Sequence, residues 1–246
     1  MTRRRWIADE VSGNRAALIG DHARHLSQVL RAHAGQEFEI SVNGEVRLAR
    51  IATVAPDRVE FELGPAVAAS PTLPITVAIS IFKFDRMEWA IEKCTELGVG
   101  RIIPLLAART ESHLASAAVK RVERWRRLAH QAAEQSRRTS PPEVADPVKL
   151  NDVLNLRTDV RIVLSEVEQD ATLRDAIPAS ASSLALAFGP EGGWKEQELA
   201  AFAQAGWKSV SLGPTILRAE TAIIASVAIA TAMLHRPSGQ PRSDSR

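Results

Sequence analysis

Hydrophobic and polar residues alternate along the first seventy residues with a period of two, which is typical of β-strands. Three alternating runs, the first two separated by Asn43-Gly44, cover residues 37–42, 45–54 and 58–63. Asn-Gly between two such runs is the strongest short signal of a β-hairpin. Residues 21–31 favour a short helix with Asp21 as its expected N-cap. The N-terminal part is therefore expected to be a small β-rich domain.

From residue 75 onward, short apolar runs alternate with helical periods. The runs lie at residues 75–82, 101–106, 160–165, 184–188 and 209–212, and residues 221–234 form a last helix that is apolar on nearly all sides. Strands that are apolar on both faces and alternate with helices indicate an α/β fold with a mostly parallel sheet. The stretch 64–74 is rich in proline and small residues, which is typical of a linker. We expect domains at residues 1–70 and 71–236 and a disordered tail at 237–246.

Composition narrows the class of protein without identifying it. The chain has 246 residues, of which 45% are hydrophobic and 24% charged, as in ordinary globular proteins. The single cysteine, Cys94, excludes a disulfide framework and favours a reducing compartment. The longest apolar stretch is too short to span a bilayer, and no apolar run follows the basic N-terminal residues. A cytoplasmic location and no membrane partner are therefore expected.

The net charge is only +2, but positive charge is concentrated in one segment. Residues 116–138 contain seven Lys and Arg and two Glu. Clustered cations on a helix attract phosphate backbones, although a solvated helix face explains the same run equally well. Five of the six histidines, at positions 25, 33, 113, 130 and 235, show no metal-ligand spacing, and no metal is expected.

Two glycine-rich segments carry the clearest chemical signal. Each follows an apolar run and precedes a predicted helix: Gly189-Pro190-Glu191-Gly192-Gly193-Trp194 and Leu212-Gly213-Pro214-Thr215-Ile216-Leu217-Arg218-Ala219-Glu220-Thr221. Such turns at the carboxyl ends of neighbouring strands are where an open α/β sheet binds its ligand. Neither turn has the spacing of a Walker loop or a dinucleotide fingerprint. Because Glu191 would repel phosphate, the pattern favours a neutral or cationic ligand.

Charged residues next to these turns are candidates for chemistry. Glu220 could simply stabilise the start of the last helix. A functional role is favoured because Arg218 lies two residues earlier, in a loop expected to overlie the first glycine turn. Lys83 and Arg86 follow the first strand of the second part and could contact a substrate phosphate, while Asp85 between them is the expected N-cap of a helix.

At these residues the chain resembles the RsmE family of bacterial 16S rRNA uracil-N3 methyltransferases, in the SPOUT class, nearly end to end. The resemblance rests on both glycine turns and on residues 3–6, 25–31, 85–99, 124–127 and 133–136. It implies a PUA-like RNA-binding β-barrel at 1–70 and a SPOUT methyltransferase domain at 71–236. It also implies a C-terminal trefoil knot and a homodimer. Phe84 departs from the family, where a small residue is common.

The resemblance also assigns roles to individual residues. It implies S-adenosylmethionine as the methyl donor, bound by Leu164, Gly189, Pro190, Glu191, Gly192, Gly193, Leu212, Gly213, Ile216 and Leu217. Arg218 would stabilise the uracil anion that forms when N3 loses its proton, and Glu220 would orient Arg218 or accept the proton. The 16S rRNA of the small ribosomal subunit would be held by Arg3, Arg4, Arg5, His25, Arg31, Lys83, Arg86, Arg124 and Arg127. Methyl transfer of this kind needs no metal.

Two other functions stay open at this point. One is a SPOUT enzyme that methylates a ribose 2′-hydroxyl in tRNA or rRNA. The other, from a different class, is a non-catalytic RNA-binding factor for ribosome assembly. A base in folded RNA must be splayed out before it is methylated, so poor activity on a short free oligonucleotide is expected.

Overall fold

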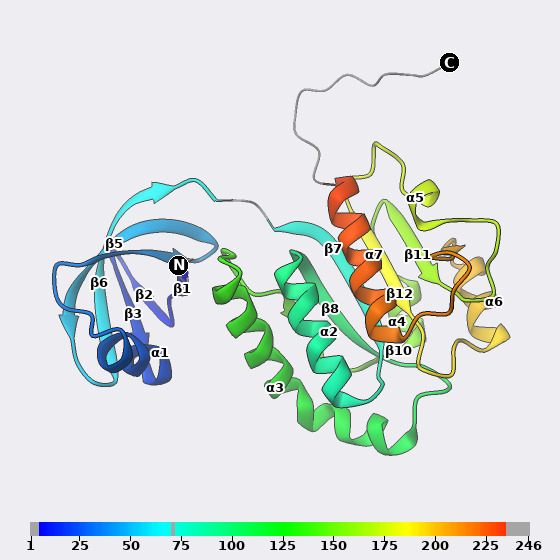
Figure 1. The fold of residues 1–246 in the computed structure, drawn as a ribbon, viewed down its shortest axis with the longest axis horizontal. Coiled ribbons are helices and arrows are strands. Elements are labelled where there is room, and N and C mark those ends of the chain that lie inside the picture. The colour runs from blue at the N-terminus through cyan, green and yellow to red at the C-terminus, as the bar shows by residue number, and fades with distance from the viewer. Residues whose placement is uncertain (1–4, 70–71, 235–246) are drawn as a thin grey trace. The chain divides into compact units, whose positions relative to one another are not determined.

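The computed structural model describes residues 5–69 and 72–234, which form two compact units (Figure 1). The first unit combines Met1–Thr72 with the later segment Ala129–Pro142, and the second contains Leu73–Leu128 and the residues from Glu143 onward. The expected tail at 237–246 lies outside the described residues.

The first unit is built on a curled six-stranded sheet with the order β1-β4-β5-β6-β3-β2. Its strands are β1 Trp6–Ile7, β2 Glu10–Ser12, β3 Arg15–Ile19, β4 Glu37–Val42, β5 Glu45–Val54 and β6 Arg58–Val67. All pairs are antiparallel except β1 with β4. Asn43 and Gly44 join β4 to β5 with positive φ angles of 52° and 83°, as the expected hairpin turn requires.

Two expectations for this unit are wrong in detail. Asp21 does not cap the helix: α1 covers Gly20–Arg24, its N-cap position is held by Ile19 with no side-chain hydrogen bond, and a π-helical turn, η1 at His25–Val29, follows. The expected linker also begins later than residue 64, because β6 continues to Val67. At Gly64 a Cβ atom would lie 2.7 Å from the carbonyl oxygen of Leu48, so glycine lets β5 and β6 stay paired there.

The second unit contains the expected parallel sheet, with the order β10-β8-β7-β12-β11-β13 and β9 paired to β8. Its strands are β7 Leu73–Ser80, β8 Val99–Leu106, β9 Glu143–Val144, β10 Val148–Lys149, β11 Val160–Leu164, β12 Leu184–Phe188 and β13 Lys208–Val210. Every pairing between them is parallel. The central strand β12 is buried along its whole length, which explains its uniformly apolar sequence.

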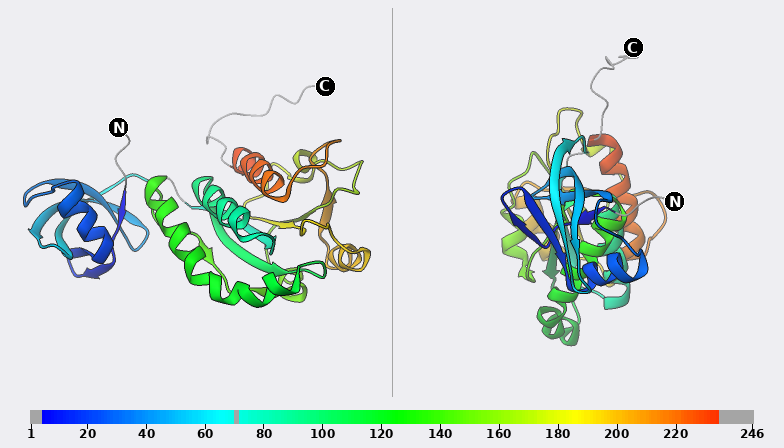
Figure 2. Two further views of the ribbon diagram at one scale, coloured as in Figure 1. Left: turned by 60° about the horizontal axis from the view of Figure 1, so that its bottom comes forward. Right: turned by 90° about the vertical axis from the view of Figure 1, so that its left-hand side faces the viewer.

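Helices cover both faces of this sheet. They are α2 Phe84–Glu96, α3 Ser112–Gln135, α4 Leu150–Leu154, α5 Leu173–Ala176, α6 Glu196–Gln204 and α7 Ala219–Leu234. The helices α2 and α7 lie side by side on one face, and α4 and α6 pack on the other (Figures 1 and 2). Asp85 is not the N-cap of α2, because the helix begins at Phe84 and Lys83 holds that position. Among the described residues, no helix has both the length and the apolarity to cross a membrane.

The strand order corrects one expectation that matters for the site. The two glycine turns were expected after neighbouring strands, but β11 lies between β12 and β13. All three strands run in the same direction, so their carboxyl ends meet at one edge of the sheet. The loop that follows β11 therefore stands between the two glycine turns.

Candidate functional site

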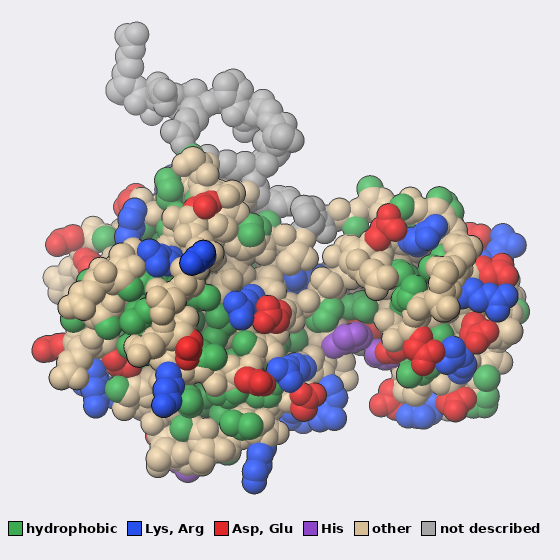
Figure 3. Space-filling model, turned by 180° about the vertical axis from the view of Figure 1, so that it is seen from behind, with side chains coloured by type: hydrophobic (Ala, Val, Ile, Leu, Met, Phe, Trp, Pro, Cys, Tyr) green, Lys and Arg blue, Asp and Glu red, His purple; other side chains and the backbone are tan. Residues whose placement is uncertain are grey.

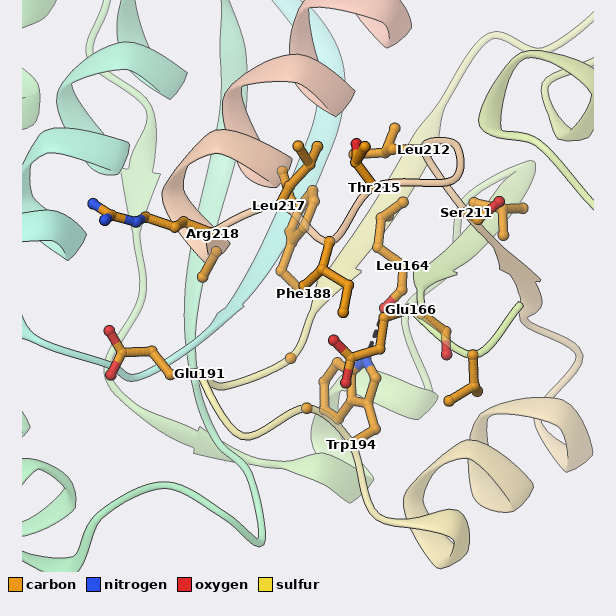
Figure 4. A pocket seen from close by; sticks show the side chains of 18 of the residues that line it. Leu164, Glu166, Phe188, Glu191, Trp194, Ser211, Leu212, Thr215, Leu217 and Arg218 are labelled. Carbon is orange, nitrogen blue, oxygen red and sulfur yellow. Dashed lines mark hydrogen bonds between the residues drawn. The ribbon is translucent and has the colours of Figure 1, made fainter. Parts of the chain in front are cut away.

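A cavity of about 420 Å³ opens at the carboxyl ends of β11, β12 and β13 (Figure 4). Residues 164–167 form one wall, the first glycine turn a second, and residues 210–219 a third. Apolar side chains point into it from each strand end or loop, among them Leu164, Phe188, Leu212 and Leu217. This size and mostly apolar lining suit a ligand of drug-like dimensions.

The structure brings most of the predicted cofactor and catalytic residues together in this cavity. Its lining includes Leu164, Gly189, Pro190, Glu191, Gly193, Leu212, Gly213, Ile216, Leu217 and Arg218. Gly192 and Glu220 do not line it. Gly192 uses its carbonyl oxygen to accept a hydrogen bond from Arg109, and Glu220 is buried at the start of α7.

Trp194 forms the floor of the cavity beneath the first glycine turn. Its indole Nε1 donates a hydrogen bond of 2.9 Å to the carbonyl oxygen of Leu164, and its ring packs edge-on against Phe202 with centroids 5.0 Å apart. A Cβ atom on Gly189 would lie 3.2 Å from this ring. Trp194 therefore fixes the glycine turn to the end of β11 and belongs to both the core and the cavity wall.

Two glycines are required in the turns for different reasons. At Gly193, φ is +69°, and a Cβ atom would lie 2.7 Å from a carboxylate oxygen of Glu166, so both the backbone and the available space demand glycine. At Gly213, φ is +123° and a Cβ atom would meet nothing within 4 Å, so only the backbone conformation demands it. Gly193 thus sets how closely the turn approaches Glu166.

Sequence reasoning missed several residues of the wall, notably Glu166. Glu166 follows β11, and the sequence of β11 does not distinguish this strand from the other buried strands. The sequence analysis also missed Ser165, Val167, Phe188 and Thr215, and it gave Trp194 no role of its own. The first acidic residue after an apolar strand is a usable signal, but only when the strand is known to lie between the two that carry glycine turns.

The charged groups at the edge of the cavity are linked through Arg86. Its guanidinium lies 2.9 Å from a carboxylate oxygen of Glu191 and 3.7 Å from one of Glu220. Arg218 is exposed and makes no ion pair with any described residue. Figure 4 places Arg218 and Glu191 on the same edge of the cavity, away from Trp194. One cation is thus neutralised by two carboxylates, and a second is available to a bound molecule.

The predicted RNA-binding residues of the first unit differ in accessibility. Arg3 and Arg4 lie outside the described residues. Arg5 is buried, donates its backbone N–H to the carbonyl oxygen of Glu134 and pairs with Glu39 at 2.9 Å. His25 is half-buried against Trp6, with ring centroids 5.7 Å apart, and Arg31 is exposed with a positive φ of 51°.

Of the four predicted cations in the second unit, Arg86 and Arg124 are paired with carboxylates of the protein itself, and the other two have no such partner among the described residues. Arg124 makes two hydrogen bonds to the carboxylate of Glu88, which raise the pKa of the Arg124 guanidinium. Lys83 and Arg127 are exposed and have no ion pair within the described part of the chain. Figure 3 shows acidic and basic side chains interspersed on the face it presents, so that face carries no broad field of one sign.

Comparison with known proteins places this arrangement among RNA-modifying enzymes. A family model described as an RNA methyltransferase domain matches residues 69–231. The ribosomal RNA small subunit methyltransferase E of Bacillus subtilis is 33% identical over 218 residues, covering 84% of this chain and 85% of that protein. The enzyme of the same name from Mycobacterium bovis is 35% identical over 221 residues, covering 86% and 84%.

Solved structures agree with the sequence matches over both units. The ribosomal RNA small subunit methyltransferase E of Neisseria gonorrhoeae, bound to S-adenosyl methionine, superposes with a TM-score of 0.83 at 29% identity and covers 94% of this chain and 98% of its own. A methyltransferase from Legionella pneumophila in complex with the same cofactor gives 0.80 at 28% identity, with coverage of 94% and 96%.

Proposed function

This chain belongs to the ribosomal RNA small subunit methyltransferase E family, and from that premise we propose that it methylates N3 of a uridine in 16S rRNA with S-adenosylmethionine as the methyl donor. The observation that carries the proposal is the cavity at the carboxyl ends of β11, β12 and β13, with an unpaired Arg218 at its edge. Its partner would be the 16S rRNA of the small ribosomal subunit, which implies the cytoplasm.

The cavity suits this cofactor in both shape and chemistry. Leu164, Phe188 and Leu217 offer apolar surface to the adenine, and the open backbone at Gly213 permits close approach. Glu166 lines the cavity without an ion pair to any described residue, so its carboxylate can receive the ribose hydroxyls or the ammonium group. When bound, S-adenosylmethionine supplies an electrophilic methyl group on a sulfonium, which an aligned and deprotonated acceptor nitrogen can take up by direct displacement.

Arg218 is the residue we assign to the acceptor base. Uracil N3 must lose its proton before it can accept a methyl group, and the negative charge then spreads over N3, O2 and O4. An exposed guanidinium at the cavity edge, with no internal carboxylate to neutralise it, stabilises that charge as it develops. This is the electrostatic contribution that we expect to be largest for this reaction.

Of the two roles considered for Glu220, the geometry favours positioning. Its carboxylate is buried, does not line the cavity, lies 3.7 Å from Nε of Arg86 and makes no ion pair with Arg218. Arg86 in turn holds Glu191 at 2.9 Å. We therefore assign Glu220 the positioning of Arg86 and, through it, of Glu191, in preference to the role of proton acceptor.

The remaining features implied by the family are part of the same proposal. The strand order, in which β11 separates the two strands that follow it in the chain, supports a trefoil knot around the cofactor. The curled sheet of the first unit supports a PUA-like RNA-binding domain at 1–70, ahead of a methyltransferase domain at 71–236. The apolar helix α7 supports a homodimer.

Mass spectrometry of 16S rRNA fragments tests the whole proposal. A strain lacking the gene is complemented with the wild-type protein, with Arg218→Ala, or with Arg174→Ala as a control on α5, outside the cavity lining. We expect one N3-methyluridine to vanish on deletion and to return with wild type and Arg174→Ala only. Loss of a ribose 2′-O-methyl mark would establish the alternative enzyme, and unchanged modification would favour an assembly factor.

A further inference from the structure

The first unit contains a second cluster of chemically active side chains, none of which lines the cavity. His22 lies in α1, and His130 and Glu134 lie near the end of α3. One possible ligand atom from each of the three lies within 4.8 Å of the others. His130 and Glu134 are four residues apart, so they share one face of the helix. Both histidines are half-buried, and Glu134 is fully buried.

The orientation of His22 indicates what this cluster binds. Its Nδ1 lies 3.1 Å from a carboxylate oxygen of Asp9, and its Nε2 lies 3.7 Å from a carboxylate oxygen of Glu134. If Nδ1 donates its proton to Asp9, the lone pair of Nε2 faces an anionic oxygen. That contact is unfavourable unless a cation lies between them. A histidine oriented by a carboxylate through one nitrogen and presenting the other is the usual arrangement at a metal.

The position of His130 distinguishes a metal from a bound proton. Its ring stacks on that of His22, with centroids 5.4 Å apart and planes 15° apart. Two adjacent imidazolium rings would repel each other, whereas two neutral imidazoles can lie side by side around one bound cation. A metal ion, by contrast, can bind a nitrogen of the His130 ring as a further ligand.

We propose that His22, His130 and Glu134 bind one divalent cation of the zinc class, and that Asp9 orients His22 for this role. Two imidazoles and a carboxylate suit zinc with a water as fourth ligand. Ligand atoms around tetrahedral zinc lie roughly 3.3 Å apart, so small side-chain rotations close the present spread of 4.8 Å. The ion would tie α1 to the segment Ala129–Pro142, which belongs to the same unit and follows α1 by more than 100 residues.

Calorimetric titration of the untagged, metal-stripped, full-length protein with zinc tests the proposal. We expect one equivalent to bind, with affinity at least tenfold weaker in His22→Gln and in His130→Gln. Asp9→Asn should weaken binding about 10- to 100-fold, as expected for a residue that orients a ligand. His33→Gln and His113→Gln are matched controls, because both histidines are exposed and outside the cluster.

Two further measurements keep the result interpretable. Cobalt in place of zinc should give the visible bands of a tetrahedral site in wild type and in His33→Gln, but not in His130→Gln. Circular dichroism should show that His130→Gln, which replaces a half-buried side chain, is folded. Absence of binding in wild type, or equal binding by wild type and His130→Gln, would overturn the proposal and leave the cluster as side chains that interact only with one another.

Discussion

At the scale of single residues, the site uses two arginines in opposite ways. Arg86 is half-buried and lies between Glu191 and Glu220, so its charge serves to hold the protein's own carboxylates. Arg218 is exposed at the same edge and is paired with none of the described residues. A cation already paired with carboxylates gains little from a substrate anion, whereas an unpaired one gains the full interaction. The two should therefore respond differently to substitution.

Arg218→Ala should lower kcat by about 100- to 1000-fold, the usual cost of removing one donor that stabilises a developing anion. Binding of S-adenosylmethionine should be unchanged, because the predicted role concerns the base. Single-turnover methylation of small-subunit rRNA and calorimetry with the cofactor measure the two quantities. Arg174→Ala, an exposed arginine on α5, should leave both unchanged. Full turnover by Arg218→Ala would show that the guanidinium has no part in the chemistry.

Gly193→Ala should weaken S-adenosylmethionine binding at least tenfold. The new Cβ atom would lie 2.7 Å from Glu166, so the turn or the carboxylate must move. The positive φ of 69° adds a backbone cost of about 1–2 kcal/mol in stability.

The matched control for Gly193→Ala is Gly206→Ala. Gly206 has a φ of +80°, lies outside the cavity lining, and its Cβ would meet only the end of the Arg161 side chain at 3.2 Å. Both variants should lose similar stability in urea denaturation, and only Gly193→Ala should lose cofactor affinity in calorimetry. Equal affinities in the two would mean that the spacing between the turn and Glu166 does not matter.

At the scale of elements, the strands that could be predicted are those whose burial is evident from their own sequence. The runs at 184–188 and 160–165 are apolar on both sides, so their assignment as buried strands needed no knowledge of neighbours, and β12 and β11 confirm it. The strands β9 and β10 have two residues each and carry no such pattern. They form only because β8 offers an edge to pair with.

Helix α3 shows why a periodic pattern does not identify the buried face. An apolar repeat with helical spacing runs through Val119, Val122 and Leu128 and predicts that Val119 faces the core, but Val119 is 68% exposed. The buried face runs through Ala118, Val122 and Trp125, where the Trp125 ring meets Phe84 of α2 edge-on at 5.9 Å. A single sequence does not show which neighbouring elements bury Ala118 and Val122 and leave Val119 exposed.

The glycine turns of the candidate site could be predicted from the sequence, but the order of the strands that carry them could not. Both glycine turns were recognised from their own residues, and the cavity contains most of them. Glu166 was missed because its importance depends on β11 lying between β12 and β13. That order is set by long-range packing, which leaves no mark in the local pattern. The partner of Glu220 was missed for the same reason, since Arg86 reaches it from another helix.

Glu39 connects β4 to the later segment of the first unit, and it gives that connection a pH dependence. Hydrogen bonds from Arg5 and Arg137 hold the pKa of Glu39 below its usual 4.5. Because the pKa is lowered in the folded state, the stabilisation is fully present above about pH 4.5 and is lost as the pH falls through the folded value. Glu39→Gln should therefore cost about 0.2–1 kcal/mol at neutral pH and nothing in strong acid.

Urea denaturation of wild type and Glu39→Gln at neutral pH and well below pH 4.5 measures this difference. Glu37→Gln is a matched control, because the neighbouring Glu37 pairs with Arg50 across β4 and β5 at an exposed position. Its effect should be small at every pH. A stability gap between wild type and Glu39→Gln that persists unchanged in acid would rule out the ion pairs as its cause.

At the scale of the whole molecule, we expect exposed cations to bind RNA and exposed apolar side chains to bind a second copy of the chain. The net charge is only +2, and acidic and basic side chains are interspersed on the face shown in Figure 3, so we expect exposed cations such as Lys83, Arg127 and Arg218 to attract RNA. Removing one of these should weaken RNA binding and reduce its salt dependence, whereas Arg124 already satisfies Glu88. Apolar side chains are exposed at several places on the described surface, and on α7 they are Ala228, Ile229 and Ala232.

The outward face of α7 is the surface at which we expect two copies of the chain to associate. Ile223 and Val227 are buried against the sheet, whereas Ala228, Ile229 and Ala232 are exposed, with Ile229 at 38%. Small residues around one larger side chain let a second helix approach closely, so a copy of α7 fits this face.

Ile229→Lys should convert a dimeric wild type to a monomer in sedimentation equilibrium, because the new charge would be buried without a partner. Val119→Lys, which charges an even more exposed apolar position on α3, should remain dimeric. A dimer that survives Ile229→Lys would place the interface on another surface, and a wild type that sediments as a monomer would remove the need for one.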